Sequence, residues 1–307
     1  MSRAVVYETF GGPEVLELRE VPEPHAGAHE VRVRVAAVGL NPMDWILSSM
    51  PEVAERFGIT LPSGFATDFA GTVDEVGEGV PGFAVGDRVH GAATGRAAAD
   101  FVVVDPFGAN ALQHTPAEIG DEVAGTLAVA GRTASAALAA VDVKAGDTVL
   151  IGGAAGGVGV FAVQLAKLAG ARVIGTASEG THDFLRRFGA EPVTYGPGLA
   201  DRVRGTAPDG VSAAIDLFGT ETAEAALALD VPAQRISTVA AGPNPPGGVR
   251  ATGGVDARPE DLERITEAIV AGEITVPIAA TYPVERIREA VRLQAGRHVH
   301  GKIVVKL

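Results

Sequence analysis

The sequence contains no cysteine, and basic side chains are fewer than acidic ones. Without cysteine the chain has no disulfide, no thiolate nucleophile and no thiolate ligand for a metal ion. Its 25 Lys and Arg residues against 38 Asp and Glu residues give a formal net charge of −13. This charge disfavours binding to a nucleic-acid backbone or an anionic membrane. Any bound phosphate must therefore be held by local geometry.

Long uncharged apolar segments are also missing. No run approaches the roughly 18 residues that a membrane helix needs, and Met1 is not followed by the basic and apolar regions of a secretory signal. We therefore expect a soluble, cytoplasmic protein. The 307 residues, 47% of them hydrophobic, suit one large or two medium domains with a sizeable core.

Residues 1 to about 115 have the pattern of strands and turns. The stretch EVRVRVAAVGL (30–40) alternates apolar and polar residues, and AGTVDEVGEGVPGFAVGDRVHG (70–91) contains short strand signals separated by Gly, Pro and Asp. This texture predicts a small β-barrel. The last part of the chain, from about 255, contains a helical segment and ends in another strand signal, which suggests a return to this domain.

Residues 116 to 254 alternate short apolar runs with helical patterns. Strands are expected at 148–151, 172–175, 213–217 and 236–239, with a helix at 158–170. Strand–helix–strand repetition predicts a doubly wound parallel sheet. The predicted organisation is thus an α/β protein with one domain from 1–115 and 255–307, and a second from 116–254.

A glycine-rich loop joins the strand at 148–151 to the following helix. Gly153, Gly156 and Gly159 are spaced GxxGxxG, and glycine allows positive φ and close approach of a ligand to the backbone. The helix that follows begins with unpaired N–H groups and a partial positive charge, which suit a pyrophosphate. The loop therefore predicts dinucleotide binding, and a purely structural turn is the alternative.

The end of the second strand bears on which dinucleotide is bound. The sequence there is VIGTAS, with hydroxyls at Thr176 and Ser178 and no acidic residue for the ribose hydroxyls. This leaves room for a 2′-phosphate and favours NADPH, with His182, Arg186 and Tyr195 as possible partners. Glu179 would repel that phosphate, so NADH stays open.

Several longer motifs resemble those of the medium-chain dehydrogenase/reductase superfamily, in its zinc-free, zeta-crystallin-type quinone oxidoreductase branch. They are FGGPEVLELREVPEP (10–24), VRVRVAAVGLNPMDW (31–45), DFAGTVDEVGEGVPGFAVGDRV (68–89), LAVAGRTASAAL (127–138), GDTVLIGGAAGGVGVFAVQLAKLAGARVIGTAS (146–178) and HGKIVV (300–305). The resemblance implies a GroES-like catalytic domain, a Rossmann domain and a cofactor in the cleft between them. It also suggests a homodimer, for which GGVRATGG (247–254) is a candidate edge.

The resemblance carries a set of cofactor contacts onto this chain. By that resemblance Asn41 and Thr133 would lie near the nicotinamide, the segment from Ala240 to Gly242 would face its carboxamide, and Lys302 would approach the cofactor. Gly156, Gly157 and Val158 would hold the pyrophosphate, and Ser178 and Tyr195 would reach the adenine ribose phosphate. Gly153 and Thr176 join these contacts from the glycine spacing and from the end of the second strand. Where many relatives carry Arg or Lys for the 2′-phosphate, this chain has SEGTHD (178–183).

Zinc-dependent relatives ligate a catalytic zinc through a Cys and a Gly-His-Glu motif. The corresponding positions here hold Asn41, Thr67 and Asp68, and no cysteine is present, so neither kind of family zinc site is expected. Without that Lewis acid, hydride transfer to a conjugated C=C bond is easier than alcohol–ketone exchange. We therefore expect a small-molecule quinone or enone as substrate.

The candidate catalytic residues are Asn41 and Asp44. Asn41 could donate a hydrogen bond to an enolate oxygen or position the cofactor, but it could equally be a turn residue before Pro42. Asp44 could relay a proton, or it could cap the helix containing WILSSM (45–50). Trp45 and Phe65 are expected to wall the substrate pocket, with packing in the core as the alternative for Trp45.

Three functions remain open from the sequence. The first is an NADPH-dependent reductase of quinones or α,β-unsaturated carbonyls. The second is an enoyl reductase dedicated to a polyketide-type pathway, suggested by the NPMD stretch (41–44). The third is a non-catalytic NADPH-binding protein, because no side chain is obligatory for the chemistry of the cofactor.

Overall fold

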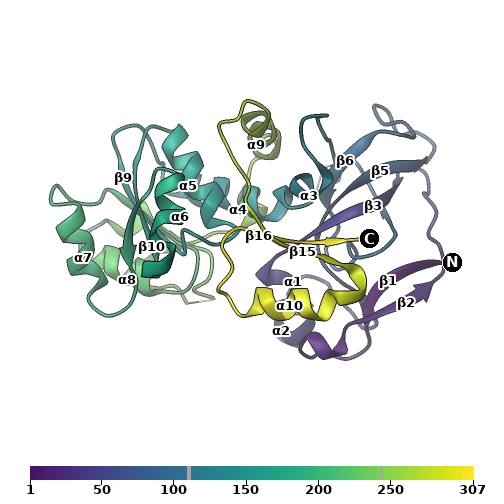
Figure 1. The fold of residues 1–307 in the computed structure, drawn as a ribbon, viewed down its shortest axis with the longest axis horizontal. Helices are drawn as coiled ribbons and strands as arrows, with labels where there is room; N and C mark the ends of the chain where they lie inside the picture. The colour runs from purple at the N-terminus through teal and green to yellow at the C-terminus, as the bar shows by residue number, and fades with distance from the viewer. Residues whose placement is uncertain (109–111, 243) are drawn as a thin grey trace. The chain divides into compact units, whose positions relative to one another are not determined.

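The computed structural model describes residues 1–108, 112–242 and 244–307. These residues form two compact units (Figure 1). Unit 1 consists of Met1–Val129 and Pro277–Leu307, and unit 2 of Ala130–Val276.

Unit 1 is built mainly from antiparallel strands. A small sheet has the order β2-β1-β4, and a larger one has the order β15-β16-β3-β5-β6-β8, with β7 also paired to β3. The strands are β1 (Ser2–Tyr7), β2 (Glu17–Val21), β3 (Val31–Leu40), β4 (Ser63–Gly64), β5 (Asp68–Val76), β6 (Arg88–Ala92), β7 (Phe101–Val104), β8 (Gln113–His114), β15 (Ile278–Pro283) and β16 (Lys302–Lys306). The C-terminal β16 pairs antiparallel with β3, so the last segment does return to the first domain.

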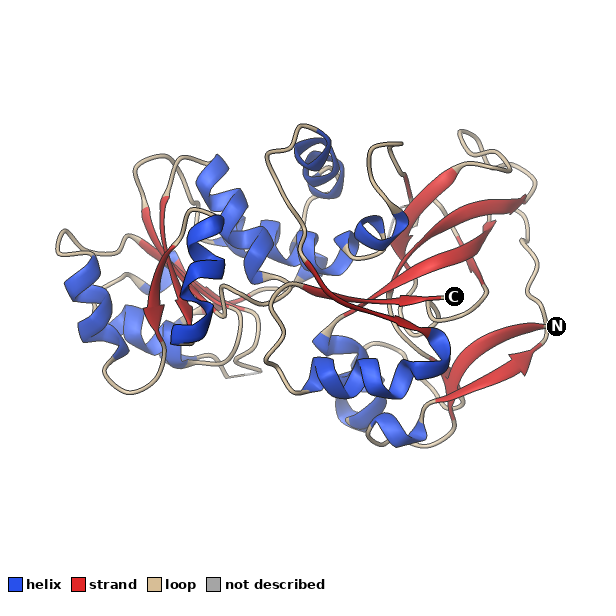
Figure 2. Ribbon diagram, viewed as in Figure 1, coloured by secondary structure: helices blue, strands red, loops and turns tan. Residues whose placement is uncertain are grey.

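The helices of unit 1 pack beside its strands and against one another (Figure 2). They are α1 (Pro42–Ser49), α2 (Pro51–Arg56), α3 (Asp121–Ala124) and α10 (Ile287–Ala295), with the short 3₁₀ turns η1 (Pro13–Val15) and η6 (Val284–Arg286). The alternating valines of β3, which are Val31, Val33 and Val35, are buried in the core. This inward set is what the period-two pattern predicted.

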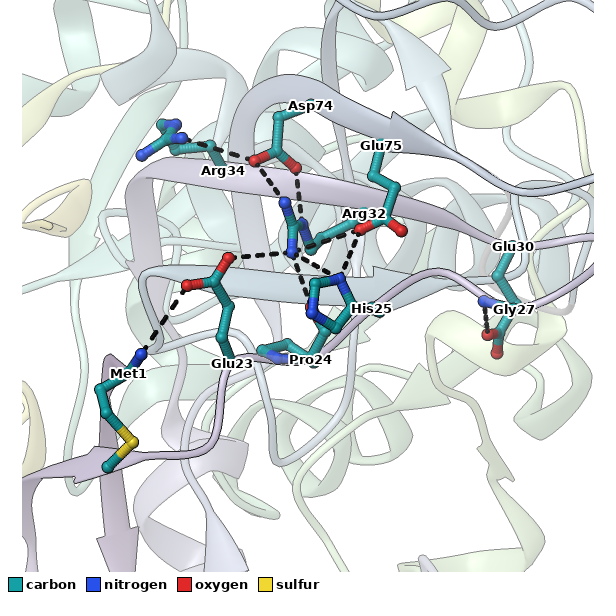
Figure 3. Close-up of polar contacts among 10 residues, drawn as sticks. All are labelled: Met1, Glu23, Pro24, His25, Gly27, Glu30, Arg32, Arg34, Asp74 and Glu75. Carbon is teal, nitrogen blue, oxygen red and sulfur yellow. Dashed lines mark hydrogen bonds and ion pairs between the residues drawn. The ribbon is translucent and has the colours of Figure 1, made fainter.

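Arg32 departs from that alternation, because it is 91% buried although the pattern places it on the polar face. Figure 3 shows its guanidinium surrounded by acidic side chains. It donates to both carboxylate oxygens of Asp74, at 2.9 and 3.1 Å, and to Glu23 at 3.1 Å. It also lies over the ring of Phe101, 4.7 Å from the centroid. These contacts compensate the cost of burying the charge.

We expect Arg32→Met to lower the free energy of unfolding by about 2–3 kcal/mol, because it leaves Asp74 without its bidentate partner in a largely buried setting. Arg34→Met is the matched control on the same strand. Arg34 is mostly exposed and its contact with Asp74 is 3.5 Å long, so its removal should change stability by less than about 1 kcal/mol. Urea unfolding of both variants measures the difference, and equal losses would contradict the assignment.

Unit 2 is a doubly wound α/β domain. Over its described residues, six strands are parallel and have the order β11-β10-β9-β12-β13-β14. They are β9 (Thr148–Gly152), β10 (Arg172–Ala177), β11 (Glu191–Thr194), β12 (Ala213–Asp216), β13 (Ile236–Thr238) and β14 (Arg250–Ala251). This confirms the predicted fold class and the four predicted strands. β11 and β14 were not predicted, since they are short and lie at the edges of the sheet.

Helices alternate with these strands. They are α4 (Leu127–Ala140), which begins at the end of unit 1, α5 (Gly159–Leu168), α6 (His182–Arg187), α7 (Leu199–Thr206), α8 (Glu221–Ala228) and α9 (Asp261–Val270). The 3₁₀ turns are η2 (Glu179–Thr181), η3 (Ala233–Arg235), η4 (Pro246–Gly248) and η5 (Gly254–Asp256). In the part of the chain that the structure describes, none of the helices is both long and apolar enough to span a membrane.

The boundaries between the units differ from those expected at residues 115 and 255. Residues 116–129 stay with unit 1, because α3 packs on β3 and the Val129 N–H donates to Asp68. Helix α9 stays with unit 2, where Ile265 lies so close to Gly131 of α4 that a Cβ at Gly131 would meet it at 2.8 Å. Packing that joins distant segments therefore decided both boundaries.

Candidate functional site

The candidate site in unit 1 begins where β3 ends and α1 starts. Asn41 is the N-cap of α1, and Pro42 occupies the first turn, where a missing N–H is tolerated. Asp44 is the third residue of the helix, and its Oδ2 accepts the Asn41 N–H at 2.7 Å. The helix therefore begins earlier than predicted, and Asn41 rather than Asp44 is its cap.

Asn41, Asp68 and Lys302 form a buried polar network across three strands. Lys302, at the start of β16, donates from Nζ to Asn41 Oδ1 at 2.6 Å and to the Leu40 carbonyl at 3.3 Å. Asn41 Nδ2 donates to Asp68 Oδ2 at 3.0 Å, and the Lys302 ammonium lies 4.0 Å from the same oxygen. The side chains of Lys302 and Asp68 are 2% and 0% exposed, so these charges face each other away from water.

The amide of Asn41 is occupied within this network. Its oxygen accepts from Lys302, and its nitrogen donates to Asp68 and, at 3.3 Å, to the Gly39 carbonyl. An amide nitrogen has two N–H bonds, so none is left for an enolate oxygen unless the network opens. The geometry therefore favours a positioning role for Asn41 over direct hydrogen bonding to a substrate.

Asp44 carries a strongly perturbed carboxyl beside this network. The pKa of Asp44 is raised to about 7, mainly by burial and in part by the negative charge of Asp68, while the Asn41 N–H, the Thr67 hydroxyl and the Lys302 ammonium act in the opposite direction. Burial likewise lowers the pKa of Lys302, against the charges of Asp68 and Asp44. Such shifts are typical of groups that exchange protons in a reaction.

One oxygen of Asp44 is not engaged by the protein. Among the described residues, Asp44 Oδ1 and the neighbouring Thr67 Oγ1 have no hydrogen-bond partner. The Thr67 hydroxyl is close enough to lower the pKa of Asp44 slightly, but it is not in hydrogen-bonding geometry with it. Buried polar atoms usually have partners, and for each of these two the nearest available partner is the other, since the Thr67 hydroxyl lowers the pKa of Asp44.

Two narrow crevices adjoin Asp44 within unit 1, and neither has room for more than about one water molecule as the side chains stand. The first is lined by Leu40, Asn41, Asp44, Trp45, Phe65, Val291 and Gln294. The second is lined by Tyr7, Asp44, Leu47, Ile59, Gly64, Phe65, Ala66 and Gly95. Asp44 and Phe65 line both. The structure thus brings Asn41, Asp44, Trp45 and Phe65 to one largely apolar crevice.

Gln294 of α10 is a lining residue that sequence reasoning missed. Its Oε1 accepts the indole N–H of Trp45 at 2.7 Å, which fixes the orientation of the ring. Asp68, which the sequence marks only as a position that belongs to the zinc motif in zinc-dependent relatives, accepts the Val129 N–H at 2.9 Å. Its second role beside Lys302 depends on pairing between β3, β5 and β16, for which the sequence carries no local signal.

The candidate site in unit 2 lies at the carboxyl ends of its parallel strands. From β9 the chain adds β10 and then β11 on one side of the sheet, and from β12 it adds β13 and β14 on the other side. The point where the strand order reverses therefore lies between β9 and β12. Ligands of doubly wound sheets bind at this point. The glycine loop directly follows β9, and Phe218, after β12, lies beside it: a Cβ at Gly153 would approach the Phe218 Cβ to 3.2 Å.

The glycine loop fits a pyrophosphate on structural grounds. Gly153 has φ of +65°, and a Cβ at Gly159 would lie 2.3 Å from the Gly153 carbonyl oxygen. The loop can therefore fold against the start of α5 only with glycine at these positions. At the start of α5 the N–H groups of Val160 and Ala162 donate to the Gly156 and Val158 carbonyls. The phosphates of a dinucleotide would therefore be held by the N–H groups of the loop that precede them, at Gly157 to Gly159.

The other residues expected to contact the cofactor lie near the same edge of unit 2. Thr176 is buried, and its hydroxyl accepts the Gly153 N–H at 3.1 Å, so it supports the loop. Ser178 follows β10 and bonds the Thr181 hydroxyl at 2.8 Å, and Tyr195 follows β11 and is 49% exposed.

Thr133 on α4 lies beside Gly254, and Ala240 and Gly242 follow β13. The loop of residues 240–254 also includes Pro243, which lies outside the described residues. Lys302, by contrast, belongs to the network of unit 1. The contacts of all these residues with a cofactor stay predictions.

Two family profiles match the chain. One, described as an alcohol dehydrogenase GroES-like domain, matches residues 27–101, and the other, described as a zinc-binding dehydrogenase, matches residues 188–305. Among the described residues no group of three or more His, Asp or Glu side chains is arranged to hold a metal ion.

Similar proteins include quinone oxidoreductases. The Pseudomonas aeruginosa protein named quinone oxidoreductase is 39% identical over 179 residues, which cover 58% of this chain and 53% of the relative. The chain thus spans about half the length of the curated relatives that it matches most strongly. The structure of mycobacterial Rv1454c complexed with NADPH aligns over 100% of both chains with a TM-score of 0.85 and 29% identity.

A further solved structure, the CurK enoyl reductase, aligns over 99% of both chains with a TM-score of 0.88 and 26% identity. The fold, the profiles and these relatives agree with the predicted resemblance. The chain belongs to the medium-chain dehydrogenase/reductase superfamily and is of the quinone oxidoreductase type.

Proposed function

We propose that this protein is an NADPH-dependent oxidoreductase that reduces a quinone or an α,β-unsaturated carbonyl compound. One observation carries the proposal: a buried carboxyl, that of Asp44, has an unengaged oxygen and lines an apolar crevice. A carboxyl with a pKa of about 7 is suited to give a proton at neutral pH. The names of the relatives support the same chemistry.

The cofactor is assigned to unit 2. The glycine loop, at Gly157 to Gly159, would hold its pyrophosphate, and Ser178 and Tyr195 would lie toward its adenine ribose. When bound, the reduced nicotinamide supplies a hydride to an electron-poor carbon of the acceptor. The last residues of β10 include no acidic side chain, which supports NADPH as the cofactor, as does the mycobacterial relative described with NADPH. The exposed Glu179, just after β10, would also allow the protein to use NADH.

The residues of unit 1 would supply the proton and hold the acceptor. Reduction of a conjugated C=C bond needs one proton besides the hydride, and we assign that proton to the Asp44 carboxyl. Asn41 holds Asp44 through its backbone N–H. Trp45 offers a flat apolar surface for a planar acceptor, and the buried Phe65 lines the same crevice.

The test is direct. Purified protein is mixed with NADPH and a panel of small quinones and unsaturated ketones, and absorbance at the NADPH band is followed. We expect oxidation of NADPH with at least one acceptor class, at a higher kcat/KM than with NADH. Tight NADPH binding without turnover of any acceptor would instead support the non-catalytic alternative.

An enoyl reductase of a biosynthetic pathway is the second candidate, favoured by the likeness to the CurK enoyl reductase. Against it, a net charge of −13 makes docking of an acidic carrier protein unfavourable. The proposal also keeps a cytoplasmic location and a homodimer. β14 is the edge strand of the unit 2 sheet, and such edges are commonly covered by a second copy.

A further inference from the structure

We propose that Asp68 acts as a positioning residue that keeps the Asp44 carboxyl protonated and ready to deliver its proton, because it holds the Lys302 ammonium on its own side of the cluster. This inference rests on the proposed function for its catalytic meaning. Its structural basis is the presence of three ionisable side chains in one buried cluster, of which two are acidic and one is basic.

The cluster has one positive charge for two carboxyls. Asp44, Asp68 and Lys302 are each at least 97% buried. Three ionised groups would leave one uncompensated negative charge away from water, which is costly. The cluster becomes neutral when one carboxyl binds a proton, so the question is which of the two does so.

Hydrogen bonding distinguishes the two carboxyls. Asp68 Oδ1 accepts the Val129 N–H and Oδ2 accepts the Asn41 amide, with the Lys302 ammonium at 4.0 Å. Donors to both oxygens stabilise the ionised form. Asp44 accepts one N–H at Oδ2, and its Oδ1 has no partner among the described residues. The proton therefore resides on Asp44.

Asn41 ties Lys302 to Asp68 rather than to Asp44. Its amide oxygen receives the ammonium, and its amide nitrogen bonds the Asp68 carboxylate. The Lys302 ammonium is thus held near Asp68 by the side-chain amide of Asn41, and no second basic side chain acts on Asp44. This arrangement gives a reason for the burial of a lysine in an otherwise apolar part of the fold.

The surroundings of Asp44 hold few other ionisable groups. Within the described chain, the charges that act on its carboxyl are those of Asp68 on β5 and Lys302 on β16. Tyr7 on β1 lines the second crevice, and burial raises its pKa, so it is uncharged near neutral pH. The residues of α10 that line the first crevice, Val291 and Gln294, carry no charge.

The test follows the protonation of Asp44 itself. Carbonyl infrared or ¹³C-aspartate NMR spectra of the whole protein are recorded from pH 4 to 9, with no acceptor present, and Asp44→Asn identifies the signal. In Asp68→Asn the Lys302 charge acts on Asp44 alone, so the midpoint should fall by about one to three pH units. In Asp68→Asn/Lys302→Met this cation is removed as well, so the midpoint should rise again.

Asp147→Asn is the matched control. Asp147 in unit 2 is also buried and ion-paired, 2.8 Å from Arg235, but it is not part of the cluster, so the midpoint of Asp44 should not change. Circular dichroism establishes that each variant is folded. If Asp68→Asn does not fold, the wild-type titration still decides.

An Asp44 already ionised at pH 5 would overturn the inference. An unchanged midpoint in folded Asp68→Asn would overturn it too. Because the titration needs no turnover, it can succeed even if no acceptor oxidises NADPH, and the two proposals can fail separately.

Discussion

Replacing Asp44 by Asn is expected to lower kcat for an unsaturated ketone by about 10²- to 10⁴-fold, the range typical for loss of a general acid. Asn keeps the shape of the side chain and an oxygen that can accept the Asn41 N–H, so α1 should stay intact. It has no acidic proton to give. NADPH affinity, which depends on unit 2 in our proposal, should change little. Steady-state kinetics and equilibrium NADPH binding measure the two effects.

Asp121→Asn provides the control for this prediction. Asp121 lies in unit 1 and pairs with Arg88 at 2.6 Å, with 37% of its side chain exposed. It is not among the charges that act on Asp44, so activity should be retained. If Asp44→Asn kept full kcat, solvent would have to be the proton source, and Asp44 would lose its assigned role.

The same substitution should alter how stability depends on pH. The pKa of Asp44 is about 7 in the folded protein and 3.8 as its ordinary value. A carboxyl with a raised folded pKa contributes stability below its unfolded pKa, and that contribution is lost as pH rises through the folded value. The loss corresponds to about 4 kcal/mol between pH 4 and 8, and Asp44→Asn should remove it from the unfolding free energy.

Replacing Gly159 by Ala is expected to weaken NADPH binding by about 10- to 100-fold. A Cβ at this position would lie 2.3 Å from the Gly153 carbonyl oxygen and 2.5 Å from the Ala154 carbonyl carbon. Backbone atoms cannot yield as a flexible side chain does, so the loop must move away from α5. The cost of such overpacking is about 1–3 kcal/mol, which corresponds to that range in Kd.

The control for the loop prediction is Gly180→Ala. Gly180 also follows β10 near the expected ribose site, but a Cβ there would meet no atom within 4 Å. Titration of intrinsic or NADPH fluorescence gives Kd for both variants. Equal affinities for Gly159→Ala and wild type would show that the glycine loop does not hold the cofactor.

The sequence by itself determined the glycine loop, four central strands and the absence of cysteine ligands. These are local properties: glycine spacing, continuous apolar runs and residue types are visible without knowing which segments meet. The sequence placed the start of α1 too late for a related reason: Asn and Asp are both common N-cap residues, so the local pattern does not distinguish Asn41 from Asp44 as the cap. Only the backbone shows that Asn41 precedes the helix and Asp44 belongs to its first turn.

Tertiary structure alone decided the buried cluster in unit 1. Lys302 lies 261 residues after Asn41, and the two meet because β16 pairs with β3. Pairing of β3 with β5 adds Asp68, and neither the charge of a lysine nor that of an aspartate predicts burial. The chemistry that we assign to Asp44 depends on how many charged side chains are buried together with it. Strand pairing between distant segments sets the number of these charges, and no local sequence pattern encodes that pairing.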